Sequence, residues 1–91
     1  MEIDVQLTAD TGDAYVFDVR VSENGDATTH RVSLSQPDWQ RLSGAADPAD
    51  LVRRSFEFLL EREPKEQIMA EFDISMISRY FPEYETKIRS R

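Results

Sequence analysis

Proton transfer at neutral pH would have to centre on His30, because histidine is the side chain suited to it and the chain has only one. The alternating pattern around His30 places it on the inward face of a predicted strand. Asp18, Ser33 and Ser35 fall on the opposite face, so a Ser-His-Asp arrangement fails on geometry. We expect His30 to be structural, with its ring buried and one nitrogen hydrogen-bonded. Because the chain also lacks cysteine, we predict that it has no catalytic residues and is not an enzyme.

Carboxylates are the other side chains with chemical potential, as ligands of a hard cation. Glu61 and Glu63 lie two positions apart on a predicted helix and therefore diverge. Asp47, Asp50 and Asp73 are explained as residues at helix starts. No calcium loop of the form Asp-x-Asp-x-Asp-Gly occurs, and the three glycines are too far apart for a phosphate loop. The sequence predicts no metal and no cofactor.

Aromatic rings and arginines, which protein interfaces favour, supply the remaining candidates. Tyr80 and Tyr84 belong to an aromatic tail, although Phe81, Tyr84 and Ile88 share one helical face, which favours packing over binding. Trp39 falls on a short helix that cannot bury an indole fully. The predicted interaction surface consists of Trp39, Arg53, Arg54, Glu57, Tyr80, Glu83 and Tyr84.

Strands must position the residues of the first third. Apolar residues alternate with polar ones from Met1 to Ala9 and again from Tyr15 to Val21, the pattern of half-buried strands. Asn24-Gly25 then fits a two-residue type I′ hairpin turn. That turn fixes the register of the second hairpin: Val21 opposite Thr28, Val19 opposite His30, Phe17 opposite Val32, Tyr15 opposite Leu34 and Asp18 opposite Arg31.

The first hairpin allows two registers. A three-residue loop over 10–12, with Gly12 at positive φ, sets Asp4 opposite Asp18, whereas a slide by two sets Asp4 opposite Arg20. We favour the first register, because a non-glycine residue at positive φ costs about 1 kcal/mol and an exposed ion pair contributes only tenths. Either register gives a three-stranded antiparallel meander. Its third strand is expected to leave an open sheet edge.

Helices are predicted from Ser35 onward. Ser35 caps a short helix that Gly44 ends, and Asp47 caps a longer helix from Pro48 to about Arg62. The longer helix is expected to lie across the sheet with a wide apolar face, which consists of Leu51, Val52, Phe56, Phe58, Leu59 and Leu60.

Pro64 separates this helix from shorter pieces. We expect a turn or two over 65–71 that carries Ile68 and Met69 inward. A further piece runs over 74–80 after Asp73, and a last one starts at Pro82 and holds Tyr84 and Ile88. With 91 residues, the chain is predicted to form a single α+β domain, with a β-meander over 1–35 and a helical part over 36–91.

The net charge and the N-terminal sequence limit the classes of partner that we expect. The net charge of −7 disfavours nucleic acid, although the acids concentrate in residues 1–30, which hold seven acids and one arginine, and leave the helical part nearly neutral. The N-terminus is acidic where a signal peptide needs basic residues, and the apolar runs are short. We expect a cytoplasmic protein with no membrane partner.

The run from Gln67 to Arg79 resembles a helix-turn-helix phrase, but its spacing is compressed and Asp73 replaces the usual turn glycine. The alternative that it raises is a nucleic-acid-binding regulator using a helix pair over 65–81.

Longer phrases in the helical part resemble a family. These phrases are Leu51-Val-Arg-Arg-Ser-Phe-Glu-Phe-Leu-Leu-Glu-Arg-Glu-Pro64, then Phe72-Asp-Ile, Ile77-Ser and Tyr80-Phe-Pro-Glu-Tyr84. Together they resemble a group of small uncharacterised bacterial proteins with a strand-rich start and such a helical end. The resemblance implies a bacterial cytosolic protein and no particular activity.

The function predicted from the sequence is a protein-interaction or regulatory module. Its partner is another protein or a second copy of itself, because an open sheet edge can pair with either. A domain that binds a small ligand between helices and sheet is the other alternative.

Overall fold

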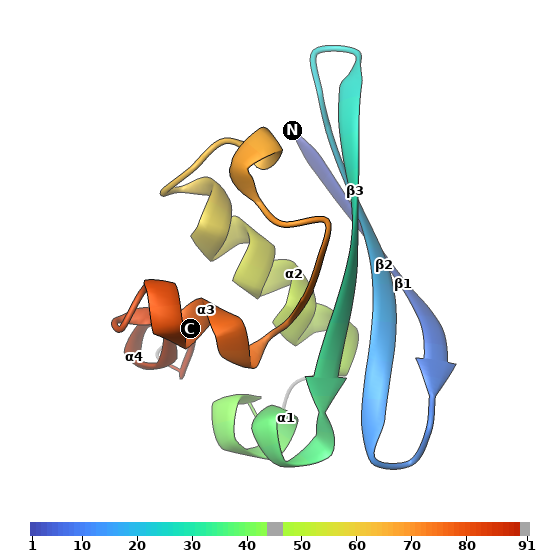
Figure 1. Cartoon of the computed structure of the whole chain (residues 1–91), viewed down its shortest axis with the longest axis vertical. Helices are drawn as coiled ribbons and strands as arrows, with labels where there is room; N and C mark the ends of the chain where they lie inside the picture. Colours follow the sequence, from blue (N-terminus) through green and yellow to red (C-terminus); the bar gives the residue numbers. More distant parts are fainter. Residues whose placement is uncertain (44–46, 90–91) are drawn as a thin grey trace.

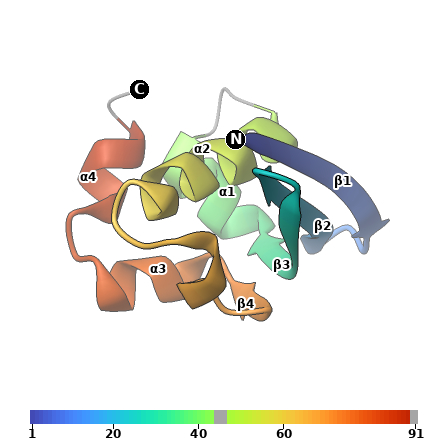
Figure 2. The ribbon, with the colours of Figure 1, turned by 90° about the horizontal axis from the view of Figure 1, so that it is seen from above.

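The computed structural model describes residues 1–43 and 47–89. Over these ranges the chain is an α+β fold with one four-stranded sheet in the order β1-β2-β3-β4. The strands are β1 (Glu2–Asp10), β2 (Ala14–Glu23), β3 (Asp26–Ser35) and β4 (Glu71–Asp73), and the helices are α1 (Gln36–Ser43), α2 (Pro48–Leu60), the short 3₁₀ helix η1 (Lys65–Gln67), α3 (Ser75–Tyr80) and α4 (Tyr84–Arg89). The helices all lie on one side of the sheet (Figures 1 and 2).

The second hairpin has the predicted register. Asn24 and Gly25 form its turn, with φ values of 55° and 80°, and Val19 pairs with His30. On the outer face Arg31 Nε lies 3.2 Å from Asp18 Oδ1, which is the predicted cross-strand ion pair. The alternation of side chains therefore directs Phe17, Val19 and their β3 partners into the core.

The favoured register of the first hairpin was wrong. Asp4 lies opposite Arg20, and the register shifts between Leu7 and Ala9, where a bulge adds one residue to β1. Gly12 still has a positive φ of 89°. With the bulge at Thr8, the turn with Gly12 at positive φ and the alignment of Asp4 with Arg20 occur together. The two cues that conflicted in a regular ladder are compatible in a bulged one.

The first two helices begin where their caps predict. Ser35 Oγ accepts a hydrogen bond from the Asp38 backbone N–H (3.3 Å), and Asp47 Oδ1 accepts one from the Ala49 N–H (3.3 Å). Gly44, the predicted end of the first helix, lies outside the described residues. The apolar face of α2 covers the sheet as expected, and its buried residues are Leu51, Val52, Ser55, Phe56, Phe58 and Leu59.

The chain after Pro64 differs most from the prediction. Only Lys65–Gln67 is helical, and the following segment is extended and forms β4, which pairs in parallel with Arg31–Ser33 of β3. The Arg31 N–H donates to the Ala70 carbonyl (2.7 Å), and the Ile74 N–H donates to the Ser33 carbonyl (2.9 Å). The sheet therefore has four strands, and β4 covers this part of the β3 edge.

Two further expectations fail for the same reason. An extended 68–73 segment cannot be the first helix of a helix-turn-helix, so the helix pair over 65–81 does not form. Extended backbone also alternates its side chains, so Ile68 is buried while Met69 is 40% exposed instead of pointing inward. The open edge expected at the third strand belongs to β1, the outermost strand on the other side.

The last two helices close the core as predicted. The Asp73 carboxylate accepts the Ser75 backbone N–H (2.9 Å) at the start of α3, and Tyr84 and Ile88 of α4 are buried. They join Phe17 and Leu34 of the sheet and Phe56 of α2 in one hydrophobic cluster. Within the ranges that the structure describes, no helix has the length and apolar character needed to cross a membrane.

Candidate interaction groove

The seven residues of the predicted interaction surface do not form one surface. Tyr84 is fully buried, so it belongs to the core and not to an interface. Its Oη lies 2.6 Å from Ser55 Oγ, and its ring packs edge-on against Phe58 with a centroid distance of 5.2 Å. Burial raises the pKa of Tyr84 to about 12, despite the hydrogen bond with Ser55. Trp39 is half-buried and packs edge-on against Tyr15, at the opposite end of the sheet from the Asn24 turn.

The charged residues of the predicted surface that lie on α2 contact other parts of the fold. Arg53 donates a hydrogen bond to the Ile3 carbonyl of β1, and Arg54 Nη2 lies 2.8 Å from Asp50 Oδ2. Glu57 is exposed on α2, close to Met1 and Ile3. Arg53 and Glu57 therefore lie on the side of α2 that faces β1, whereas Arg54 pairs with a residue of its own helix.

Glu83 and Tyr80 lie near the C-terminal end of α2. Arg62 Nε donates to Glu83 Oε2 (3.1 Å), while the Arg62 guanidinium stacks on the Phe58 ring at 3.6 Å. The backbone N–H of Glu83 and the Arg62 contact lower the pKa of the Glu83 carboxyl. Tyr80 is 65% exposed and is the predicted residue that reaches the groove described next.

An apolar groove of about 420 Å³ opens between the end of α2, η1, β4 and α3. Leu59, Phe72 and Ile77 line it from the core side, and each is at least nine-tenths buried. Met69 and Tyr80 also line it and are 40% and 65% exposed. The sequence prediction found Tyr80 but missed Met69, because it placed Met69 inside a helix instead of on an extended segment.

The lining of the groove is mostly apolar and contains two methionines. Two thioethers, those of Met69 and Met76, can adapt to the shape of a ligand because methionine side chains are flexible and polarizable. Glu63 is the charged residue of the lining, and Gln67 adds an amide. No nucleophile paired with a base occurs among the residues that line it, so the groove offers an apolar site with one acidic group at its margin.

His30 holds the backbone at one wall of this groove. Its Nδ1 donates to the Met69 carbonyl (2.8 Å), since a carbonyl can only accept, and its Nε2 lies 2.8 Å from Thr28 Oγ1. His30 is 2% exposed, and its ring lies tilted against that of Phe56 with a centroid distance of 5.4 Å. His30 is structural as predicted, but both of its nitrogens are bonded, and one bond fixes the segment that carries Met69.

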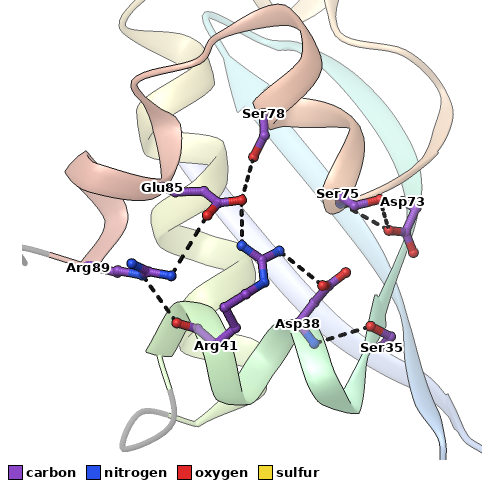
Figure 3. A network of polar contacts seen from close by, with 8 residues as sticks. All are labelled: Ser35, Asp38, Arg41, Asp73, Ser75, Ser78, Glu85 and Arg89. Carbon is purple, nitrogen blue, oxygen red and sulfur yellow. Dashed lines mark hydrogen bonds and ion pairs between the residues drawn. The ribbon is translucent and has the colours of Figure 1, made fainter.

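A polar network fixes α3, which forms another wall of the groove (Figure 3). Arg41 of α1 bridges Asp38 Oδ1 (3.0 Å) and Glu85 Oε2 (2.5 Å) of α4. Ser78 of α3 donates to the same Glu85 carboxylate (3.1 Å), and Arg89 Nε donates to the Arg41 carbonyl (3.2 Å). The hydrogen bond from Arg41 lowers the pKa of Glu85. The network joins α1, α3 and α4, and its charges are matched within the fold.

Asp73 fixes β4 next to the start of α3 (Figure 3). Its two carboxylate oxygens accept from Ser33 Oγ and from Ser75 Oγ, each at 2.6 Å. Partial burial of Asp73 acts to raise its pKa, but the hydrogen bonds from both serines outweigh burial, so the pKa lies below the ordinary value. The carboxylate thus ties β3, β4 and the start of α3 together and sets the position of Phe72 in the groove.

Among residues 1–43 and 47–89, no group of three or more His, Cys, Asp or Glu side chains is arranged to hold a metal ion. Comparison with models of protein families, with curated proteins and with solved structures gives no match. The resemblance to small bacterial proteins therefore stays a prediction.

Proposed function

We propose that the protein is a non-enzymatic interaction module of the cytoplasm whose groove receives an apolar side chain of a partner protein. The observation that carries the proposal is the exposure of Met69 (40%) and Tyr80 (65%) at a groove whose deeper walls are apolar. Exposed aromatic and aliphatic side chains that border a pocket are typical of binding sites. The predicted function is retained, and the proposed site moves from the seven predicted residues to this groove.

The acidic residues around the groove favour a partner segment with a basic residue next to the apolar side chain that enters it. Glu63 is half-buried in the lining and forms no ion pair within the described ranges, and Glu71 is exposed on β4 nearby. The chain as a whole carries −7. A segment with one large apolar residue next to Lys or Arg would fill the groove and match this charge. The volume of about 420 Å³ is sufficient for one large side chain and part of its neighbour.

The three methionines provide the test. Peptides selected from a random library on the immobilised protein would be titrated while the methionine methyl resonances are recorded by NMR. Met69 and Met76 line the groove, whereas Met1 precedes β1 and does not line it, so the resonances of the first two should shift and that of Met1 should not. Tyr80→Ala should weaken binding about tenfold, the loss typical of an exposed aromatic anchor.

Leu7→Ala is the matched control, because Leu7 is exposed to a similar degree (53%) but lies on β1. It should leave peptide affinity unchanged. Peptides that bind Tyr80→Ala and the unmodified protein equally, or that shift only the Met1 resonance, would place the site elsewhere.

A small apolar ligand is the second candidate for the same groove, since about 420 Å³ falls in the range of small-molecule pockets. Neutral aromatic fragments would be titrated with the same methyl readout. Fragment binding together with the absence of selectable peptides would replace the protein partner by a small ligand.

A further inference from the structure

The outer edge of β1 presents backbone groups that the β1–β2 ladder does not use, and the hydrogen bonds at the other side of the sheet show which ones these are. Arg31 and Ser33 direct their amide groups to β4. Because backbone direction alternates along a strand, Val32 bonds to β2 at its partner Phe17.

The alternation continues through β2. Since Phe17 bonds to β3, Asp18 bonds to β1 at its partner Gln6, and the even-numbered residues of β1 face β2. Ile3, Val5 and Leu7 therefore direct their N–H and C=O groups away from the sheet. The hydrogen bond from Arg53 to the Ile3 carbonyl is an independent sign that this carbonyl lies outside the β1–β2 ladder.

We infer that two copies of the chain pair antiparallel through β1, with Val5 on the two-fold axis, and form one continuous eight-stranded sheet. This interface is separate from the groove and does not rest on its function. The charges of β1 indicate that the partner strand is that of a second copy. On the Val5 axis, Asp4 lies opposite Gln6 of the second copy and Glu2 lies opposite Thr8, so no acid faces an acid.

Neighbouring two-fold registers are less favourable. An axis at Ile3 sets Glu2 opposite Asp4, and an axis at Asp4 sets that residue opposite itself. Like charges directly opposite one another destabilise a ladder. Axes at Gln6 and Leu7 set the bulge residue Thr8 opposite Asp4 and Gln6 of the second copy, so the irregular part of β1 would lie inside the new ladder. The Val5 axis avoids both problems, because it leaves Thr8 at the end of the ladder.

The same register covers apolar surface that the single chain leaves exposed. Leu7 is 53% exposed and would lie opposite Ile3 of the second copy. A hollow of about 310 Å³ lies beside Ile3, and it is also lined by Met1, Leu60 and the two acids Glu57 and Glu61. Leu7 of one copy is positioned to fill this hollow in the other, twice per dimer, and Met1, which is 65% exposed, lies at its margin.

Two substitutions test the surface. Leu7→Glu places a third acid beside Glu57 and Glu61 in the hollow, and Leu7→Pro removes an N–H that the β1–β2 ladder does not use. The unmodified protein should sediment as a dimer, and each variant should raise the dimer dissociation constant at least tenfold while its circular dichroism stays unchanged. Met69→Glu is the matched control, because it introduces the same charge at an exposed position in the groove, and it should remain dimeric.

Single cysteines test the register, because the chain has none of its own. On the Val5 axis the two copies of Val5 are about 5.5 Å apart at Cα, within reach of a disulfide, whereas the two copies of Leu7 are about 14 Å apart. Val5→Cys should form a disulfide-linked dimer on mild oxidation and Leu7→Cys should not.

Three results would overturn the inference. A monomer at high micromolar concentration would rule out the dimer, and a dimer that survives both Leu7→Glu and Leu7→Pro would rule out this surface. Cross-linking of Leu7→Cys in place of Val5→Cys removes the register.

Discussion

Ser55 Oγ and Tyr84 Oη lie 2.6 Å apart inside the core and join α2 to α4. Ser55 Oγ also lies 2.8 Å from the Leu51 carbonyl, one helical turn earlier. Because a carbonyl can only accept, Ser55 donates to Leu51, and the Tyr84 hydroxyl donates to Ser55. The pair is therefore directional, and its two members are not equivalent.

Removal of the Tyr84 hydroxyl and removal of the Ser55 hydroxyl should lower the free energy of unfolding by different amounts. Tyr84→Phe leaves Ser55 bonded to Leu51 and should lower the free energy of unfolding by about 1 kcal/mol. Ser55→Ala leaves the buried Tyr84 hydroxyl without its acceptor and should cost more, about 1–3 kcal/mol. Urea denaturation measures both. Equal costs, or a double variant as unstable as the sum of the two, would contradict the directional pair.

Alkaline pH should weaken the fold through Tyr84. Burial raises the pKa of its hydroxyl to about 12, above the ordinary value of 10.0. The stabilising contribution of the neutral hydroxyl is therefore complete below pH 10 and is lost as the pH rises from 10 toward 12. Absorbance of phenolate should show one of the three tyrosines titrating near pH 12, and Tyr84→Phe should abolish that step. A titration curve that Tyr84→Phe leaves unchanged would contradict the assignment.

Low pH should weaken the fold through protonation of Asp73. Its pKa is lowered in the folded state, because hydrogen bonds from Ser33 and Ser75 outweigh partial burial. A lowered pKa stabilises the fold above the unfolded-state value, near 4, and this contribution is lost as the pH falls further. Asp73→Asn should cost about 1–2 kcal/mol at pH 7, and the difference from the unmodified protein should shrink below about pH 4.

Asp13→Asn is the control for Asp73, because Asp13 is an exposed loop residue. Its effect on the free energy of unfolding should stay within about 0.5 kcal/mol at both pH values. A cost of Asp73→Asn that does not change between pH 7 and pH 3 would show that the loss is steric and not electrostatic.

The second hairpin turn depends on backbone conformation at Gly25. Its φ is 80°, and a Cβ added there would meet no atom within 4 Å, so the cost of a side chain is conformational alone. Gly25→Ala should destabilise the fold by about 1 kcal/mol, whereas Gly25→Asn should cost less, because Asn tolerates positive φ. Thermal unfolding of the two variants gives the comparison. Equal losses would mean that the turn does not require positive φ.

Local patterns predicted the elements whose residues are close in sequence. The Asn24-Gly25 turn fixes the second hairpin, because it allows one register and that register also aligns the apolar faces. Asp47 and Pro48 mark the start of α2 for a similarly local reason, since a cap bonds to a backbone N–H two residues away. The burial of Tyr84 and Ile88 followed from their shared helical face, but their partners did not.

The features that carry the proposed functions depend on residues far apart in the chain. A three-residue strand such as β4 has no readable period, and it forms because β3 offers an unpaired edge about 40 residues earlier, which also leaves Met69 exposed at the groove. The bulge at Thr8 reconciled two local preferences that a regular ladder sets against each other. Short-range geometry was thus determined by the sequence itself, whereas the exposed sheet edge and the groove were decided by which distant backbone groups the tertiary structure pairs.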